Sequence, residues 1–138
     1  MAVPEELRVS LRILGDDLVP SEITMLLECL PTKSQSKGDV IEGKKTGKLR
    51  EAKTGGWWLL APACFDGNLN SQILGLLALL NDEVSVWTDL SDRFKLDLFV
   101  GVFLSSGNDG IGLSPKTLKA IGDRGIELDL DIYSKDLS

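Results

Sequence analysis

Carboxylates are the residues of this sequence best suited to chemistry, because the 138-residue chain contains no histidine. Without histidine there is no Ser-His or Cys-His nucleophile and no His-ligated metal site. Asp16 and Asp17 follow an expected strand, and two adjacent acids could hold Mg²⁺ or Ca²⁺. A solvated turn in which aspartate caps the bend is the simpler interpretation of the pair.

Three other motifs resemble parts of known sites but lack the spacing that defines them. Residues 44–47 read Lys-Lys-Thr-Gly without the glycine spacing of a phosphate-binding loop. Residues 108–110 read Asn-Asp-Gly, yet no regularly spaced ligands and no terminal glutamate of a calcium loop follow. Asp89 and Asp92 could form a catalytic pair, but a surface helix with a local ion pair explains them as well. The sequence therefore predicts no catalytic residue, no metal and no cofactor.

Trp57 and Trp58 are the most unusual pair in the sequence. Neighbouring side chains of a β-strand point to opposite faces, so one of the two rings is expected in the core. The other is expected either beneath a neighbouring loop or exposed as a binding platform, since tryptophan is enriched at binding hot spots. The pattern leaves open which of the two is buried.

Composition and charge are those of an acidic globular protein, and many cytosolic proteins are acidic. The net charge is −6, which argues against binding to a nucleic-acid backbone and would suit a basic protein. The longest strongly apolar stretch, residues 73–80, is too short to span a bilayer, and the acidic N-terminus does not resemble a signal peptide. We therefore expect a cytoplasmic location, no membrane partner, and reduced thiols at Cys29 and Cys64.

Hydrophobic periodicity predicts the elements that must position these residues. Apolar residues alternate along several segments as in half-buried strands, and they recur at helical spacing along three others. Thr54-Gly55-Gly56 is a turn signal, so the strands on either side of it are expected to form a hairpin. Residues 83–95 are ambiguous between helix and irregular structure. The predicted strands are 7–13, 48–53, 57–61, 96–104 and 126–133, and the predicted helices begin near Pro20, Leu69 and Pro115.

This order of elements predicts one domain over residues 1–138 with an α+β fold. We expect an antiparallel-rich sheet of about five strands with helices on one face, in a ferredoxin-like arrangement with an added helix, and a long exposed loop over 32–48. The first and last strands would then be antiparallel neighbours. That pairing would bring Asp16 and Asp17 close to Glu127 and Asp129 and create an acidic patch at one edge of the sheet.

Several segments together resemble a family of bacterial domains called domain of unknown function 4279. They are Ser10-Leu11-Arg12-Ile13, Pro20-Ser21-Glu22-Ile23-Thr24, Pro31-Thr32, Gly56-Trp57-Trp58-Leu59 and Leu128-Asp129-Leu130-Asp131-Ile132-Tyr133. The resemblance runs from about residue 8 to residue 134. The family has no established activity, so the resemblance implies no catalytic residues. It implies a stand-alone, bacterial, cytoplasmic module, and by analogy some small acidic modules are immunity proteins that neutralise a toxin.

Three functions remain open from the sequence. The first is a non-enzymatic protein-binding module, immunity-type or regulatory, that uses the acidic patch (Asp16, Asp17, Glu127, Asp129) or the Trp57/Trp58 pair. The second is a small-molecule-binding or carboxylate-using enzyme domain with a pocket near the 32–48 loop. The third is a structural domain that forms a homodimer through an exposed sheet face.

Overall fold

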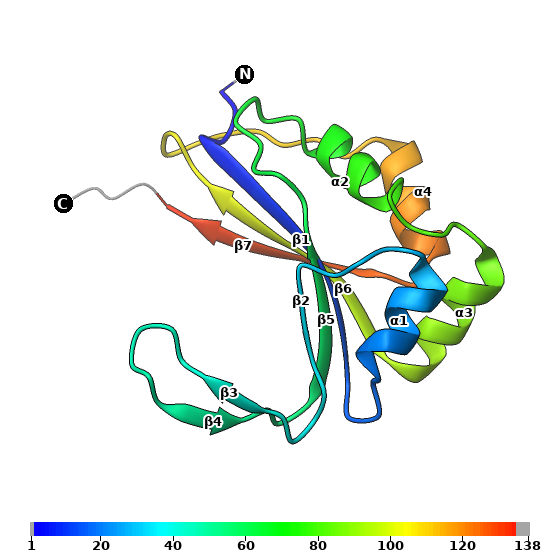
Figure 1. Ribbon diagram of the computed structural model, residues 1–138. Coiled ribbons are helices and arrows are strands. Elements are labelled where there is room, and N and C mark those ends of the chain that lie inside the picture. Colours follow the sequence, from blue (N-terminus) through cyan, green and yellow to red (C-terminus); the bar gives the residue numbers. More distant parts are fainter. Residues whose placement is uncertain (1, 135–138) are drawn as a thin grey trace.

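The molecule has two layers, a five-stranded sheet and a layer of helices that covers one face of it (Figure 1). The computed structural model describes residues 2–134. The strands are β1 (Glu6–Gly15), β2 (Lys33–Gln35), β3 (Val40–Glu42), β4 (Leu49–Glu51), β5 (Gly55–Leu60), β6 (Lys95–Phe103) and β7 (Glu127–Tyr133). The helices are α1 (Pro20–Leu27), α2 (Leu69–Leu77), α3 (Val84–Arg93) and α4 (Pro115–Asp123).

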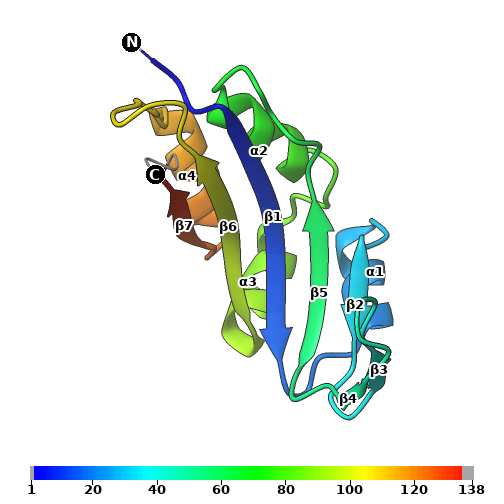
Figure 2. The ribbon, with the colours of Figure 1, turned by 90° about the vertical axis from the view of Figure 1, so that its left-hand side faces the viewer.

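The order of the main sheet is β2-β5-β1-β6-β7, and β3 pairs with β4 in a separate two-stranded sheet. All neighbours in the main sheet are antiparallel except β6 and β7, which are parallel. Figure 2 shows the sheet in front with the helices behind it. The predicted α+β fold, with an antiparallel-rich sheet and helices on one face, is confirmed.

The core lies between the sheet and the helices, where the alternation of the strands predicts it. Every second residue of β1 and β6 points toward the helices and is buried. Trp57 and Leu59 of β5 extend this layer, and the apolar stripes of the helices cover it. The helix residues in the core include Ile23 and Leu27 of α1, Ile73, Leu76 and Leu77 of α2, Trp87 and Leu90 of α3, and Ile121 of α4.

The helix starts follow the sequence signals closely. The Oδ1 of Asn68 accepts a hydrogen bond from the Ser71 N–H at 3.1 Å, and Ser114 caps α4 in the same way through the Thr117 N–H. The ambiguous segment 83–95 forms α3, whose Trp87 and Leu90 are buried at helical spacing. Because only these two apolar residues of α3 are fully buried, the sequence showed no wide apolar stripe there.

The hairpin predicted between residues 48–53 and 57–61 is wrong. Instead, β4 pairs with β3, and β5 pairs with β1 and β2. Gly55 and Gly56 form no turn but lie within β5, and a Cβ on Gly55 would approach the Gly15 carbonyl oxygen to 2.7 Å. Gly55 therefore allows β5 to lie close against β1, whereas Gly56 leaves room for the Trp58 ring. The predicted loop over 32–48 is largely exposed, but it contains β2 and β3.

The predicted pairing of the first and last strands, expected from a ferredoxin-like order, is also wrong. β6 lies between β1 and β7, so the first and last strands do not touch as neighbours. Leu130 lies on the helix side of β7 but is 49% exposed, because β7 is an edge strand that α4 covers only in part. In residues 2–134, no helix combines the length and the apolar character needed to cross a membrane.

Candidate functional site

Among residues 2–134, no helix covers the face of the main sheet opposite α1–α4, which is here called the open face (Figure 2). Alternation along the strands brings charged and aromatic side chains to this face, because their neighbours point into the core. From β1 and β5 they are Arg8, Ser10, Arg12, Trp58 and Leu60, and from β6 and β7 they are Asp97, Phe99, Phe103, Glu127, Asp129, Asp131 and Tyr133.

A partly buried ion pair joins β1 and β6 on the open face. Arg12 and Asp97 are directly opposite each other on β1 and β6. The Arg12 Nε donates to Asp97 Oδ1 at 2.7 Å, and Nη2 donates to Oδ2 at 2.6 Å. The Asp97 side chain is 1% exposed, whereas that of Arg12 is 28% exposed. The pair is therefore bidentate, and its negative partner is almost completely removed from water.

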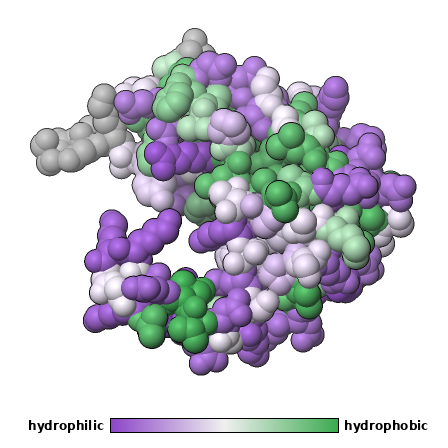
Figure 3. Space-filling model, viewed as in Figure 1, coloured by the Kyte–Doolittle hydropathy of each residue, from purple (hydrophilic) through white to green (hydrophobic). Residues whose placement is uncertain are grey.

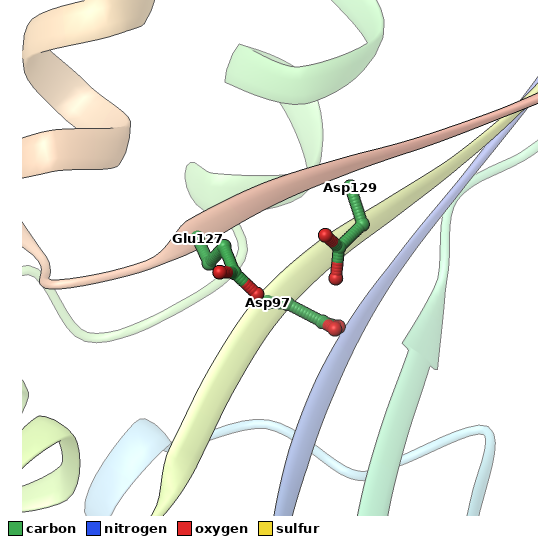
Figure 4. Close-up of side chains that lie close together, drawn as sticks. All are labelled: Asp97, Glu127 and Asp129. Carbon is green, nitrogen blue, oxygen red and sulfur yellow. The ribbon is translucent and has the colours of Figure 1, made fainter.

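Two more carboxylates, those of Glu127 and Asp129, lie near Asp97, as Figure 4 shows. Oxygens of Asp97, Glu127 and Asp129 lie within 4.8 Å of one another, because the parallel register places Asp97 beside Glu127. Such a cluster could supply oxygen ligands to a divalent cation. However, Arg12 already donates to both oxygens of Asp97 and lies 3.8 Å from Asp129. The arrangement is thus an ion-pair network in which the guanidinium takes the place that a cation would need.

The network shifts two carboxyl pKa values in opposite directions. Burial opposes ionisation of Asp97, but the hydrogen bonds from Arg12 and Asp129 and the charge of Arg12 hold its pKa below the ordinary value. The hydrogen bond to Asp97, partial desolvation and the nearby Glu127 raise the pKa of Asp129. Asp97 is therefore the carboxylate that stays ionised, and Asp129 is the one whose negative charge is disfavoured.

Replacing Asp129 with asparagine is expected to raise the free energy of unfolding at pH 7 and to leave it unchanged at pH 3. A pKa raised in the folded state means that ionisation opposes folding. The cost appears as the pH rises through and above the ordinary aspartate pKa of about 3.9. Urea unfolding at both pH values measures the difference. Asp123→Asn on α4 is the control, and a loss of stability in Asp129→Asn at pH 7 would contradict this account.

Aromatic rings beneath cationic side chains cover much of the remaining open face. The Arg12 guanidinium lies 4.4 Å from the Phe99 ring centre, and the Lys33 ammonium lies 4.5 Å from that of Trp58. Phe103 stacks on Tyr133 with ring centres 4.7 Å apart. Phe99 and Phe103 are thus partly covered by side chains of the sheet itself. Cation–π contacts of this kind hold the rings and the cations in defined positions.

The two neighbouring tryptophans have different environments. Trp57 points into the core, is 0% exposed, and donates from its Nε1 to the Thr24 Oγ1 at 3.1 Å. Trp58 is half-buried on the open face, and its ring lies so close over Gly56 that a Cβ there would be 2.2 Å from it. Of the two predicted binding residues, only Trp58 belongs to the open face.

The predicted acidic residues fall into two separate places. Glu127 and Asp129 lie together in the network with Asp97. Asp16 and Asp17 are exposed after β1, where Asp16 forms an ion pair with Lys37 at 3.3 Å. The side-chain hydrogen bond with Thr54 and the contact with Lys37 lower the pKa of Asp16. Asp16 and Asp17 were expected near Glu127 because β1 and β7 were predicted to pair. Since these strands do not pair, the argument for that proximity no longer holds.

Asp97 is the main site residue that the sequence analysis missed. The sequence does distinguish Asp97, because it is the one acidic residue within the otherwise apolar run 96–104, which was predicted to be a central strand. A carboxylate in such a place requires a partner of opposite charge on the neighbouring strand. Choosing Arg12 as that partner required the register between β1 and β6, which the sequence alone does not provide.

The hairpin of β3 and β4 projects beside the open face (Figure 1). Figure 3 shows it standing away from the body of the molecule, with apolar atoms on its surface. Val40 and Leu49 contribute to this surface and are 69% and 70% exposed. Exposed apolar residues on a projecting hairpin are a feature of surfaces that contact other molecules.

Two hollows adjoin the site. One of about 460 Å³ lies on the open face between Arg8, Phe99, Phe103 and Tyr133. The other, of about 780 Å³, is a mainly apolar groove between residues 61–66 and α2, with Phe65 and Leu79 at its exposed sides. Neither is lined by residues of the 32–48 segment, where a pocket was expected.

Fold and site together define an α+β domain with a one-sided sheet whose uncovered face is charged and aromatic. Comparison with protein-family models finds a match to the domain of unknown function 4279 over residues 5–135. The chain therefore belongs to this family, as its sequence motifs indicated. No curated protein and no solved structure gives a significant match.

Proposed function

We propose that this domain is a non-enzymatic, cytoplasmic module of the immunity or regulatory type that binds a basic protein through its open face. The observation that carries the proposal is the uncovered sheet face with Trp58, Phe99, Phe103 and Tyr133 among arginines. Aromatic residues and arginine are enriched in the centres of protein interfaces. The projecting β3–β4 hairpin adds exposed apolar area beside this face.

Charge favours a basic partner over other classes. The chain carries a net charge of −6, and three carboxylates of β7 lie along one side of the open face. A basic protein would be attracted to this side and would associate faster at low salt, whereas nucleic acid would be repelled. The three acids are Glu127, Asp129 and Asp131.

Site-specific photo-crosslinking in cells of the source organism tests this proposal. A benzophenone amino acid at Leu60, which is 52% exposed on the open face, is expected to crosslink to one distinct protein. The same group at Leu118, which is 51% exposed on α4, is the matched control and is expected to give no such product. With the purified partner, Trp58→Ala is expected to weaken binding at least about tenfold, which is about 1.4 kcal/mol. Equal crosslinking at both positions would contradict the proposal.

A second candidate function, binding of a small molecule, is favoured by one observation. The groove between residues 61–66 and α2 has about 780 Å³ and a mainly apolar wall, which is the size range of ligand sites. Native mass spectrometry of protein purified from the source organism would detect a retained ligand. Gly75 lines the groove, and a Cβ there would meet no other atom of the described residues within 4 Å. Retention that Gly75→Leu abolishes, without a crosslink at Leu60, would favour this function over protein binding.

A further inference from the structure

β7 is a long edge strand with an unpaired outer side. In residues 2–134 its single strand neighbour is β6, with which it pairs over seven positions. The opposite edge of the sheet is β2, which has three residues. Proteins often keep their edge strands short, which limits pairing with strands of other chains, but β7 has seven residues. The β7 edge is therefore the side of the sheet at which another strand has room to add.

The backbone of β7 presents a regular set of hydrogen-bonding groups to this edge. The Leu104 N–H donates to the Tyr133 carbonyl oxygen at 3.0 Å, so Tyr133 directs its backbone groups toward β6. In a parallel strand these directions alternate from residue to residue. Glu127, Asp129 and Asp131 share the orientation of Tyr133. The N–H and C=O groups of the intervening residues, Leu128, Leu130 and Ile132, consequently point outward.

The side chains of β7 give its two faces opposite character. Glu127, Asp129 and Asp131 lie on the open face. Leu130 and Ile132 lie on the other face, where they are 49% and 59% exposed because α4 covers only the beginning of the strand. A strand that pairs with this edge would place alternate side chains beside carboxylates and beside aliphatic groups.

A second copy of the same strand does not fit this edge. Directly opposite residues of paired strands lie on the same face, so β7 against β7 would oppose acid to acid. Like charges in such positions are destabilising. The negative charge of Asp129 is already disfavoured by its neighbours, so a further carboxylate opposite it would add to the repulsion. The pattern thus selects against self-pairing and in favour of a segment with basic residues at alternate positions.

We propose that the outer edge of β7 binds an extended segment of a basic protein as a sixth strand, with Lys or Arg alternating with Val or Ile. Backbone hydrogen bonds from Leu128, Leu130 and Ile132 provide the affinity, and the alternating carboxylates provide the specificity. This inference rests on the proposed protein-binding function and assigns the partner a conformation and a sequence pattern.

The probe for the test is a fluorescent seven-residue peptide in which Lys and Val alternate. It is expected to bind at least tenfold more tightly than a peptide of the same composition with its Lys and Val residues in two blocks. Asp131→Lys is expected to weaken binding of the alternating peptide about tenfold. The control Asp123→Lys, on α4, is expected to leave binding unchanged.

Amide hydrogen exchange followed by NMR locates the peptide. The amides of Leu128, Leu130 and Ile132 are expected to become protected on binding. Equal affinity for the alternating and block peptides, or binding without protection of these three amides, would overturn the proposal. Protection that depends on protein concentration in the absence of peptide would overturn it in favour of a second copy. Crosslinking at Leu60 with no peptide binding would reject the edge site and leave the open-face function intact.

Discussion

Trp57→Ala is expected to lower the free energy of unfolding by about 3–5 kcal/mol. The ring is completely buried between the sheet and α1, and its removal leaves a cavity that the neighbouring residues can fill only in part. The Thr24 hydroxyl oxygen also loses the hydrogen bond that it accepts from the indole N–H. Urea unfolding followed by circular dichroism measures the loss.

The adjacent residue provides a matched control. Trp58→Ala removes a ring of the same size from the open face, where it is half-buried beneath Lys33, and we expect a loss of about 1 kcal/mol or less. Trp57→Phe keeps most of the apolar volume, so its loss of stability is expected to lie between those of Trp57→Ala and Trp58→Ala. If Trp57→Ala does not fold, Trp57→Phe can be compared with Trp58→Ala instead. Equal losses at positions 57 and 58 would show that the assignment of the two faces is wrong.

Arg12→Met is expected to cost about 3 kcal/mol at pH 7, because it leaves the Asp97 carboxylate buried without a positive partner. This cost is at the lower end of the about 3–5 kcal/mol that is typical when one partner of a buried ion pair is removed, since Arg12 itself is partly exposed. The folded-state pKa of Asp97 is depressed, so the stability that the pair contributes is present above the ordinary aspartate pKa of about 3.9. It is lost as the pH falls toward the folded-state value, and the difference between wild type and variant should shrink there.

Two further variants separate the loss of the ion pair from a general loss of packing. Arg12→Met combined with Asp97→Leu replaces both charges with apolar groups and is expected to recover most of the stability. Arg8→Met removes an ion pair with Glu6 and a cation–π contact with Phe103, both made by a largely exposed Arg8 side chain, and should cost less than about 1 kcal/mol. A double variant that is no more stable than Arg12→Met would show that the site depends on the charges themselves.

The spacing of apolar residues along the chain predicted most of the helices and strands, because it indicates which side of each element is buried. The alternation in β1 and β6 and the caps of α2 and α4 depend on residues close together in the chain, and the structure confirms them. The neighbours of each strand depend instead on packing between distant segments. Gly55 and Gly56 show this most clearly, because they suggested a turn, whereas Gly55 allows a close approach of β5 to β1 and Gly56 leaves room for the Trp58 ring.

The candidate site was less predictable than the fold for the same reason. Trp58, Glu127 and Asp129 were singled out as unusual residue types, and each lies on the open face. Asp97 and Arg12 became recognisable as a pair only with the strand register. Asp16 and Asp17 were expected beside Glu127 and Asp129 because the first and last strands were predicted to be neighbours, whereas β6 lies between them.

The central position of β1 has a consequence for how the chain reaches this structure. β1 ends at Gly15, but its two neighbours begin only at Gly55 and Lys95. Contacts between such distant segments require closure of long loops, which slows folding relative to a protein of local contacts. During synthesis, β1 remains without its β6 neighbour until the chain has been extended beyond Lys95. The apolar side of β1 is therefore exposed during this interval, and it is a surface to which a chaperone would bind.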